Sequence, residues 1–194
     1  MEKWKQTLLK EDSYSRLKQI SDIYAKNLGV RKSYGDIIKE MVEEKLALLL
    51  LPEKAREYLY EYVHEIIKDD SVMGIRLFGS VAKMKWNKYS DIDLFIVLRS
   101  DPVKFMDKTD EIDNKLYYLQ KELFKEGYGF YVSPLIVDLE SLKIFKPIYL
   151  EIVLCGITLF DRKDTISNFV NNIKKTIKYH PYSNGGGTIE WRKK

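Results

Sequence analysis

The stretch from Asp91 to Leu98 limits the possible folds more than any other part of the chain. It alternates acidic and apolar residues at first and then runs continuously apolar to its end. Alternation places Asp91 and Asp93 on the same face of a β-strand, whereas a continuous apolar run suits a strand end that is buried on both faces. The sequence therefore predicts a strand inside a layered α/β domain, with two carboxylates at the start of that strand.

The segments around this strand predict helices first and then alternating strands and helices. Apolar residues recur at helical spacing near residues 17–28, 33–49 and 52–67, and Ser33 with Asp36 is a weaker form of a capping box. Further strands are expected at 75–78, 129–137 and 156–160, and further helices at 81–84, 102–125, 139–154 and 166–179. We expect an N-terminal helical segment at 1–70, a catalytic domain at 71–180 and a tail at 181–194.

Composition excludes several classes of protein. The formal net charge of +4 suits an anionic substrate but is too small for a dedicated DNA-binding surface. Cys155 is the only cysteine, so an intrachain disulfide is impossible and a cytoplasmic setting is expected. The longest apolar run, Leu46 to Leu51, is too short to cross a membrane.

The two aspartates form half of a candidate active site. Like charges held this close repel one another, and a cation placed between them relieves the repulsion. Mg²⁺ prefers one or two carboxylates together with water and substrate phosphates. We therefore expect Asp91 and Asp93 to bind Mg²⁺ and to act as catalytic residues.

Gly79 and Ser80 form the other half of that site. They follow the strand expected at 75–78, and ten residues separate Ser80 from Asp91. Glycine permits a tight turn that a phosphate can approach, and amides at the start of a following helix would favour the anion. The Ser80 hydroxyl and the Lys83 ammonium can add contacts. A triphosphate bound to the turn and to the metal would be placed for in-line attack on its α-phosphorus.

The spaced pattern from Leu77 to Leu94 resembles the nucleotidyltransferase superfamily that includes DNA polymerase β. It is most similar to the minimal nucleotidyltransferases, whose signature is a hydrophobic residue, Gly-Ser, a spacer near ten and Asp-hydrophobic-Asp-hydrophobic. The resemblance covers about residues 72 to 161. It implies a small mixed β-sheet with flanking helices, a nucleoside triphosphate as substrate and Mg²⁺ as cofactor. Relatives include antitoxins that adenylylate a HEPN-type toxin ribonuclease, which implies a possible protein acceptor.

The chain departs from this pattern at several positions. Members often carry arginine at the position of Val81 and glycine at that of Met84. The family usually places a third carboxylate on a later strand, and the register puts that position near Ser133 or Leu135. Asp138 is the nearest acid and is retained as a candidate catalytic residue, although its parity points it to the other face of a regular strand.

Two functions remain open from the sequence. The first is a magnesium-dependent enzyme that transfers a nucleoside monophosphate, expected to be AMP from ATP, to a hydroxyl group on an acceptor such as a toxin protein. The second is a catalytically degenerate nucleotide-binding or scaffolding module that acts through its helical N-terminus as a dimer or nucleic-acid adaptor. The missing third carboxylate favours the second, and an acid close to Asp91 and Asp93 would favour the first.

Overall fold

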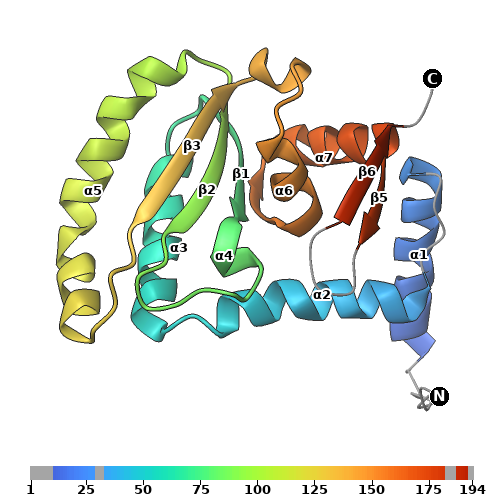
Figure 1. Ribbon diagram of the computed structural model, residues 1–194, viewed down its shortest axis with the longest axis horizontal. Coiled ribbons are helices and arrows are strands. Elements are labelled where there is room, and N and C mark those ends of the chain that lie inside the picture. Colours follow the sequence, from blue (N-terminus) through green and yellow to red (C-terminus); the bar gives the residue numbers. More distant parts are fainter. Residues whose placement is uncertain (1–10, 29–32, 182–186, 192–194) are drawn as a thin grey trace. The chain divides into compact units, whose positions relative to one another are not determined.

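The computed structural model describes residues 11–28, 33–181 and 187–191 (Figure 1). The chain divides into two compact units, Met1–Glu43 and Glu44–Lys194. Among the described residues, no helix combines the length and the apolar character that are needed to cross a bilayer.

The first unit contains α1 (Glu11–Leu28) and the beginning of α2 (Tyr34–Leu49). The Ser33 hydroxyl accepts a hydrogen bond from the Asp36 amide at 3.1 Å and donates one to the Asp36 carboxylate at 2.8 Å. This reciprocal pair fixes the start of α2 and confirms the cap expected at Ser33. Association of two subunits through these helices stays a prediction.

The second unit contains a four-stranded mixed sheet. Its strands are β1 (Val72–Phe78), β2 (Ile92–Leu98), β3 (Val132–Asp138) and β4 (Ile157–Asp161). The spatial order is β3-β2-β1-β4, with β1 antiparallel to β2 and β4, and β2 parallel to β3. The parallel pair requires a crossover connection, which α5 (Pro102–Lys125) supplies. The expected α/β class with a small mixed sheet is confirmed.

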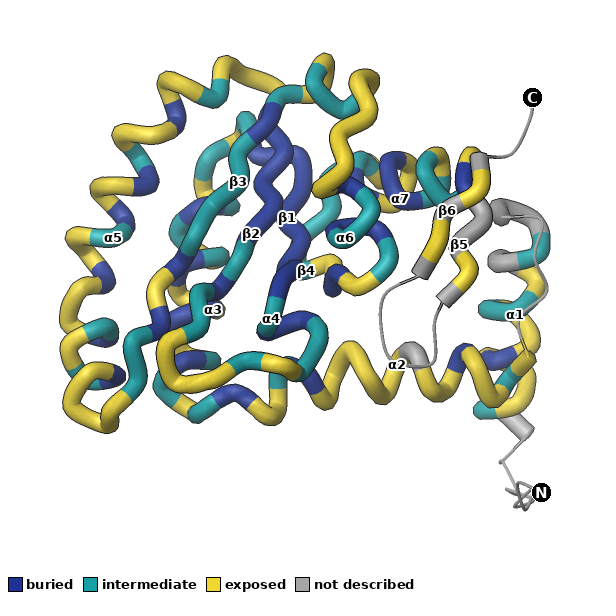
Figure 2. The backbone as a smooth tube through the Cα atoms, in the orientation of Figure 1, coloured by how far each residue is buried: buried dark blue, intermediate teal, exposed yellow. Residues whose placement is uncertain are grey.

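Helices cover both faces of this sheet, so β1 and β2 are buried along most of their length (Figure 2). One face packs against α3 (Glu53–Ile67) and α5. The other face packs against α6 (Ile148–Cys155) and α7 (Thr165–Thr176). Burial on both faces explains why the far end of β2 is continuously apolar.

Alternation along β2 assigns its side chains to the two layers. Ile92 and Leu94 belong to the core beneath α3 and α5, whereas Phe95 belongs to the core beneath α6 and α7. The Phe95 ring contacts Tyr149 and Phe169, with ring centroids 5.7 and 5.6 Å apart. Because residues two apart share a face, Asp93 must face the same layer as Phe95.

The helix α3 is part of the compact unit that holds the sheet, whereas the sequence places a boundary near residue 70. Tyr58, Leu59, Tyr62 and Ile66 on α3 are fully buried in the core beneath α5. Their apolar area stabilises the sheet, so the chain divides before α3 and not after it.

Two further expectations differ from the structure. The helix expected at 139–154 is interrupted: a short 3₁₀ helix, Ser141–Lys143, is followed by an extended stretch, and α6 begins only after Pro147. Proline cannot donate the amide hydrogen bond that a helix interior needs, so it begins a helix instead. The last expected helix ends at Thr176, and β5 (Ile177–Pro181) then pairs antiparallel with β6 (Gly187–Trp191). The expected tail therefore contains a strand, while its residues 182–186 and 192–194 lie outside the described part.

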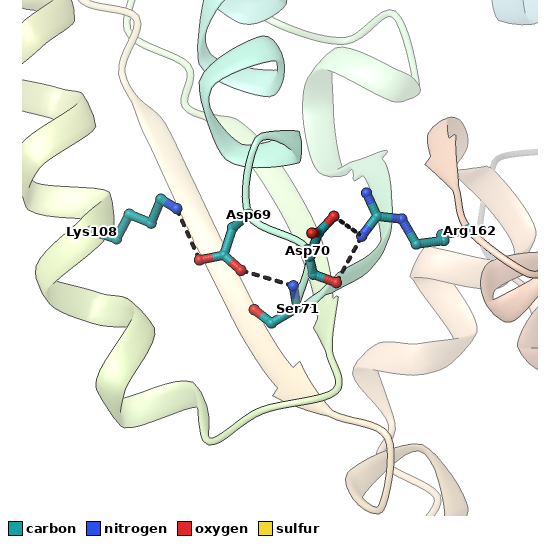
Figure 3. A network of polar contacts seen from close by, with 5 residues as sticks. All are labelled: Asp69, Asp70, Ser71, Lys108 and Arg162. Carbon is teal, nitrogen blue, oxygen red and sulfur yellow. Dashed lines mark hydrogen bonds and ion pairs between the residues drawn. The ribbon is translucent and has the colours of Figure 1, made fainter.

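A polar network fixes the turn between α3 and β1 (Figure 3). The Asp69 carboxylate accepts hydrogen bonds from Lys108 Nζ on α5 and from the Ser71 amide, both at 2.8 Å. Arg162, which follows β4, donates to the Asp70 carbonyl at 2.7 Å and to its carboxylate at 3.3 Å. One short turn thus links α5, β1 and β4 beyond the apolar core.

Candidate active site

The Gly79–Ser80 turn and the aspartate pair meet in space. Phe78, the last residue of β1, stands opposite Asp93 in the antiparallel register. Gly79 has a positive φ of 71° and is buried. A Cβ placed on Gly79 would lie 2.7 Å from Asp93 Cγ, which shows that the carboxylate occupies the space above the glycine. The structure therefore brings together the two halves of the site that the sequence suggested.

The turn continues into α4 (Gly79–Ala82), which is only one turn long. Ser80 is half-buried, and Lys83 closes the helix by donating its amide to the Gly79 carbonyl at 3.2 Å. So short a helix adds little dipole, and the Gly79 backbone and the Ser80 hydroxyl are the main anion donors here. Met84, at the position where similar proteins often carry glycine, has a φ of 55°. The left-handed conformation explains why glycine suits that position.

The site carries an excess of negative charge. Burial, followed by the charges of Asp91 and Glu151, raises the pKa of Asp93, and the nearby Lys83 partly offsets these effects. Two carboxylates on one face of a strand, one of them with a raised pKa, fit a divalent cation with oxygen ligands. The donor set of this site thus suits the metal that the sequence implies.

Glu151 is the residue that the sequence-based reasoning missed. It lies on α6 and forms a 2.7 Å ion pair with Lys83 Nζ, with both side chains 35% exposed. The charge of Glu151 helps to raise the pKa of Asp93. A third acid therefore does approach Asp91 and Asp93, but it comes from the helix α6 and not from β3. Glu151 is the one acidic residue in the otherwise apolar segment of α6. A single charged residue among apolar ones is unusual, and this feature of the sequence could have marked Glu151 as a candidate site residue.

The position opposite Asp93 on β3 is Ser133, one of the two positions, Ser133 and Leu135, that the sequence left open. Asp138 stands opposite Leu98, five residues farther along the strand, which corresponds to about 16 Å. Its carboxylate accepts a hydrogen bond from the Ser141 amide at 2.7 Å, and the Ser141 contacts hold the pKa of Asp138 below its ordinary value. The structure thus separates Asp138 from Asp91 and Asp93, and its contacts are those of a turn-capping residue.

Arg76 holds α6, and with it Glu151, against β1. Its Nε donates to the Ile152 carbonyl at 2.7 Å and its Nη2 to the Val153 carbonyl at 3.4 Å. Arg76 is buried, and its positive charge lies at the last turn of α6, where a cation complements the helix dipole.

A second group of possible metal ligands lies on α3. The ligand atoms of Glu61, His64 and Glu65 all fall within 4.8 Å of one another, a spacing that Asp91, Asp93 and Glu151 do not reach as a set. Glu65 is already paired with Lys68 at 2.5 Å and with Lys115 at 2.8 Å. This cluster is therefore an ion-pair group on the surface of α3.

Comparison with known proteins identifies the family. Residues 59–172 match the family described as nucleotidyltransferase domain. A candidate protein adenylyltransferase of Methanocaldococcus jannaschii is 30% identical over 117 residues, which cover 56% of this chain and 72% of that protein.

Two solved structures were also matched, at low identity and with low TM-scores. One is a toxin–antitoxin complex with AMP-PNP, with 17% identity over 62% of this chain and 83% of that chain and a TM-score of 0.39. The other is a tri-AMPylated Shewanella oneidensis HEPN toxin in complex with an MNT antitoxin, with 19% identity over 59% and 82% of the two chains and a TM-score of 0.37.

The matched residues, 59–172, include the Gly79–Ser80 turn, the aspartate pair and Glu151. Membership of this family favours an enzyme over the degenerate binding module that the sequence left open. The chain belongs to the nucleotidyltransferase domain family and is a nucleotidyltransferase.

Proposed function

We propose that the protein transfers the AMP group of ATP, bound with Mg²⁺, to a hydroxyl group of a protein acceptor. The observation that carries this proposal is the contact of the Asp93 carboxylate with the Gly79 turn. The similarity to a candidate protein adenylyltransferase supports AMP as the group and a protein as the acceptor. A HEPN-type toxin is the acceptor that the sequence resemblance implies, and the reaction would take place in the cytoplasm.

The residues of the site have distinct roles in this proposal. Asp91 and Asp93 would hold Mg²⁺, which supplies charge neutralisation for the triphosphate. The Gly79 backbone and the Ser80 hydroxyl would bind the phosphates that leave as pyrophosphate, and Lys83 would add positive charge. Phosphoryl transfer needs little covalent chemistry from the protein, so positioning and electrostatic stabilisation supply most of the rate.

Lys83 must change partner for this role. In the structure it is paired with Glu151, whose charge also disfavours an anion near Asp93. A triphosphate offers several anionic oxygens and can displace one half-exposed carboxylate, because such an ion pair contributes only about 0–1 kcal/mol. Glu151 thus holds Lys83 in place until the nucleotide binds.

Transfer of label from ATP tests the proposal. The protein is incubated with Mg²⁺, a purified HEPN-type toxin and ATP labelled at either the α- or the γ-phosphate. We expect the α-label to appear on the toxin and the γ-label to leave with pyrophosphate. Asp93→Asn should reduce transfer by at least about 100-fold, because it removes a carboxylate that would hold the Mg²⁺ whose positive charge stabilises the transition state.

Asp138→Asn is the matched control, since it makes the same change on the neighbouring strand far from the turn. It should transfer label at the rate of the unchanged protein. Transfer by Asp93→Asn that equals transfer by Asp138→Asn would show that the proposed site is wrong.

A further inference from the structure

A pocket of about 490 Å³ lies between the C-terminal half of α5 and the segment that leads into β3. Its walls are mainly aromatic and include Tyr117, Phe124, Tyr128 and Phe130. Phe130 belongs to the core beneath α3 and α5, whereas Asp93 faces the layer of α6 and α7. The pocket therefore belongs to the other layer of the domain, and the proposed reaction does not use it.

The inner wall of the pocket is held in place by contacts within the protein. The rings of Tyr128 and Phe130 are stacked, with centroids 5.7 Å apart and planes at 23°, and Phe130 also contacts the edge of Trp86 at 5.5 Å. Gln120 lines the pocket as well, and its side-chain amide donates to the Tyr58 hydroxyl at 2.6 Å. A wall that is ordered before a ligand arrives lowers the entropic cost of binding.

The outer wall of the pocket is aromatic and exposed. Phe124 is 77% exposed, and Tyr117 and Tyr131 are 53% and 51% exposed. Aromatic residues are enriched at protein–protein interfaces, and tyrosine is common among the residues that carry most of the binding energy. Aromatic rings also attract one another in offset or edge-to-face contacts. The outer wall therefore suits an aromatic side chain that a partner protein inserts.

The charge of the pocket restricts the chemistry of that partner. Among the described residues that line it, Lys121 and Lys125 are cationic and none is acidic. Lys121 Nζ lies 4.5 Å from the centre of the Tyr117 ring, so a positive charge stands directly at the aromatic wall. Glu122, which follows Lys121, pairs instead with Lys54 on α3 at 3.1 Å. Two lysines at an aromatic hollow complement acidic groups placed on either side of an aromatic anchor.

We propose that this pocket docks an acidic segment of a partner protein, which inserts one aromatic side chain into it. A second copy of this chain is a poorer occupant, because its net charge is +4. A single-stranded nucleic acid is also a poorer occupant, because it needs a track of cations along its backbone and the described lining residues supply two. The inference goes beyond the proposed function and does not rest on it.

Titration of the isotope-labelled whole protein with short end-blocked peptides, followed by NMR, tests the docking site. The first peptide is Glu-Asp-Trp-Asp-Glu. The second replaces its tryptophan by alanine, and the third is the basic peptide Lys-Arg-Trp-Arg-Lys. The first should shift the amide signals of residues 117–131 and bind at least about tenfold more tightly than the other two, the effect of losing one anchor residue. Equal binding of the second or third peptide, or no binding of the first, would overturn the inference.

Substitutions in the pocket test which side chains bind the peptide. Phe124→Ala should weaken binding of the acidic peptide by about tenfold. Tyr118→Ala is the matched control, because Tyr118 is 56% exposed on the same helix and is not among the residues that line the pocket. It should bind the peptide as the unchanged protein does. Equal effects of the two substitutions would contradict the docking site.

Reversal of the charge gives a test that loss of folding cannot imitate. The double variant Lys121→Glu with Lys125→Glu should bind the basic peptide more tightly than the acidic one, whereas an unfolded protein would bind neither. A double variant that still prefers the acidic peptide would exclude the two lysines as the source of the selectivity and would overturn the proposal.

The other occupants are tested on the same protein. Octauridylate represents single-stranded RNA, and indole-3-acetate represents a small aromatic acid. Both should bind more weakly than the acidic tryptophan peptide. Tighter binding of either one that Phe124→Ala removes would assign the pocket to that ligand and overturn the proposal. Self-association that Phe124→Ala abolishes, measured by sedimentation, would assign it to a second copy of the chain with the same consequence.

Discussion

The Asp93 carboxylate lies directly against Gly79, at a distance that leaves no room for a side chain on the glycine. An added Cβ at position 79 would stand 2.7 Å from Asp93 Cγ and 3.1 Å from Asp93 Cβ. Gly79 also has a φ of 71°, which side chains disfavour. The close approach of Asp93 and the backbone conformation therefore both require glycine at position 79, and together they allow the Asp93 carboxylate to lie against the turn.

Gly79→Ala is expected to abolish nucleotide transfer. It should also lower the free energy of unfolding by more than the roughly 1–2 kcal/mol that a left-handed alanine costs, because the Asp93 side chain must move as well. Urea denaturation and the label-transfer assay measure the two effects.

Gly127→Ala is the control that separates the effect of the contact with Asp93 from the effect of the backbone conformation. Gly127 has a φ of 85°, and an added Cβ there would meet nothing within 4 Å. This variant should show only the conformational loss of stability and should transfer label normally. Equal losses of stability and activity in the two variants would contradict a specific role for the contact with Asp93.

Glu151→Gln is expected to lower the Kd of Mg²⁺–ATP by up to about fivefold, the range of a half-exposed ion pair. The change frees Lys83 for the phosphates and removes a charge that acts on Asp93. Titration calorimetry measures the affinity. Glu140→Gln is the control, because Glu140 pairs with Lys143 at 2.6 Å on an exposed surface. Weaker ATP binding in Glu151→Gln would mean that Glu151 assists the nucleotide and does not compete with it.

The contact between the turn and the aspartates could be predicted from the sequence because both motifs obey local rules. Asp91 and Asp93 share a face through the two-residue period of a strand, and Gly79 ends the strand that pairs with theirs. The register left Ser133 and Leu135 open as the position of the third carboxylate, and the structure places Ser133 opposite Asp93. The start of α2 followed from the short-range bonds between Ser33 and Asp36.

The features that the sequence did not predict depend on contacts between distant segments. Glu151 and Lys83 are 68 positions apart in the chain, and no local sequence pattern predicts that they form an ion pair. The assignment of α3 to the sheet unit depends on how α3 packs against α5. The hairpin of β5 and β6 has strands of only five residues each, too short for a clear alternation to stand out from loop sequence.

Asp69→Asn is expected to destabilise the protein near neutral pH by about 1 kcal/mol. The hydrogen bond from Lys108 lowers the pKa of Asp69 to about 2, although burial opposes the shift. A carboxyl with a depressed pKa in the folded state stabilises that state above its unfolded pKa of about 4, and this stabilisation is lost as the pH falls toward about 2. The stability difference between the two proteins should therefore shrink across that window.

Urea midpoints measured between about pH 7 and pH 2 check this dependence. Asp70→Asn is the control, because its side chain is 86% exposed and contacts Arg162 at 3.3 Å. It should change the midpoint little at any pH. A difference between the unchanged protein and Asp69→Asn that stays constant down to the lowest pH would exclude the ion pair with Lys108 as its source.

Arg76→Met is expected to lower the free energy of unfolding by about 1–3 kcal/mol, because it removes charge-assisted hydrogen bonds to buried carbonyl groups. Arg76 donates to the Ile152 and Val153 carbonyls at the last turn of α6. Arg76→Lys should recover only part of the loss, because an ammonium group lacks the fork of donors that reaches both carbonyls. Arg99→Met, at an exposed position after β2, is the control and should leave the free energy of unfolding unchanged.

Because α6 carries Glu151, Arg76→Met should also loosen the ion pair between Glu151 and Lys83 and shift ATP affinity in the same direction as Glu151→Gln does. Loss of stability without any change in ATP affinity would show that Arg76 supports the fold but does not position Glu151.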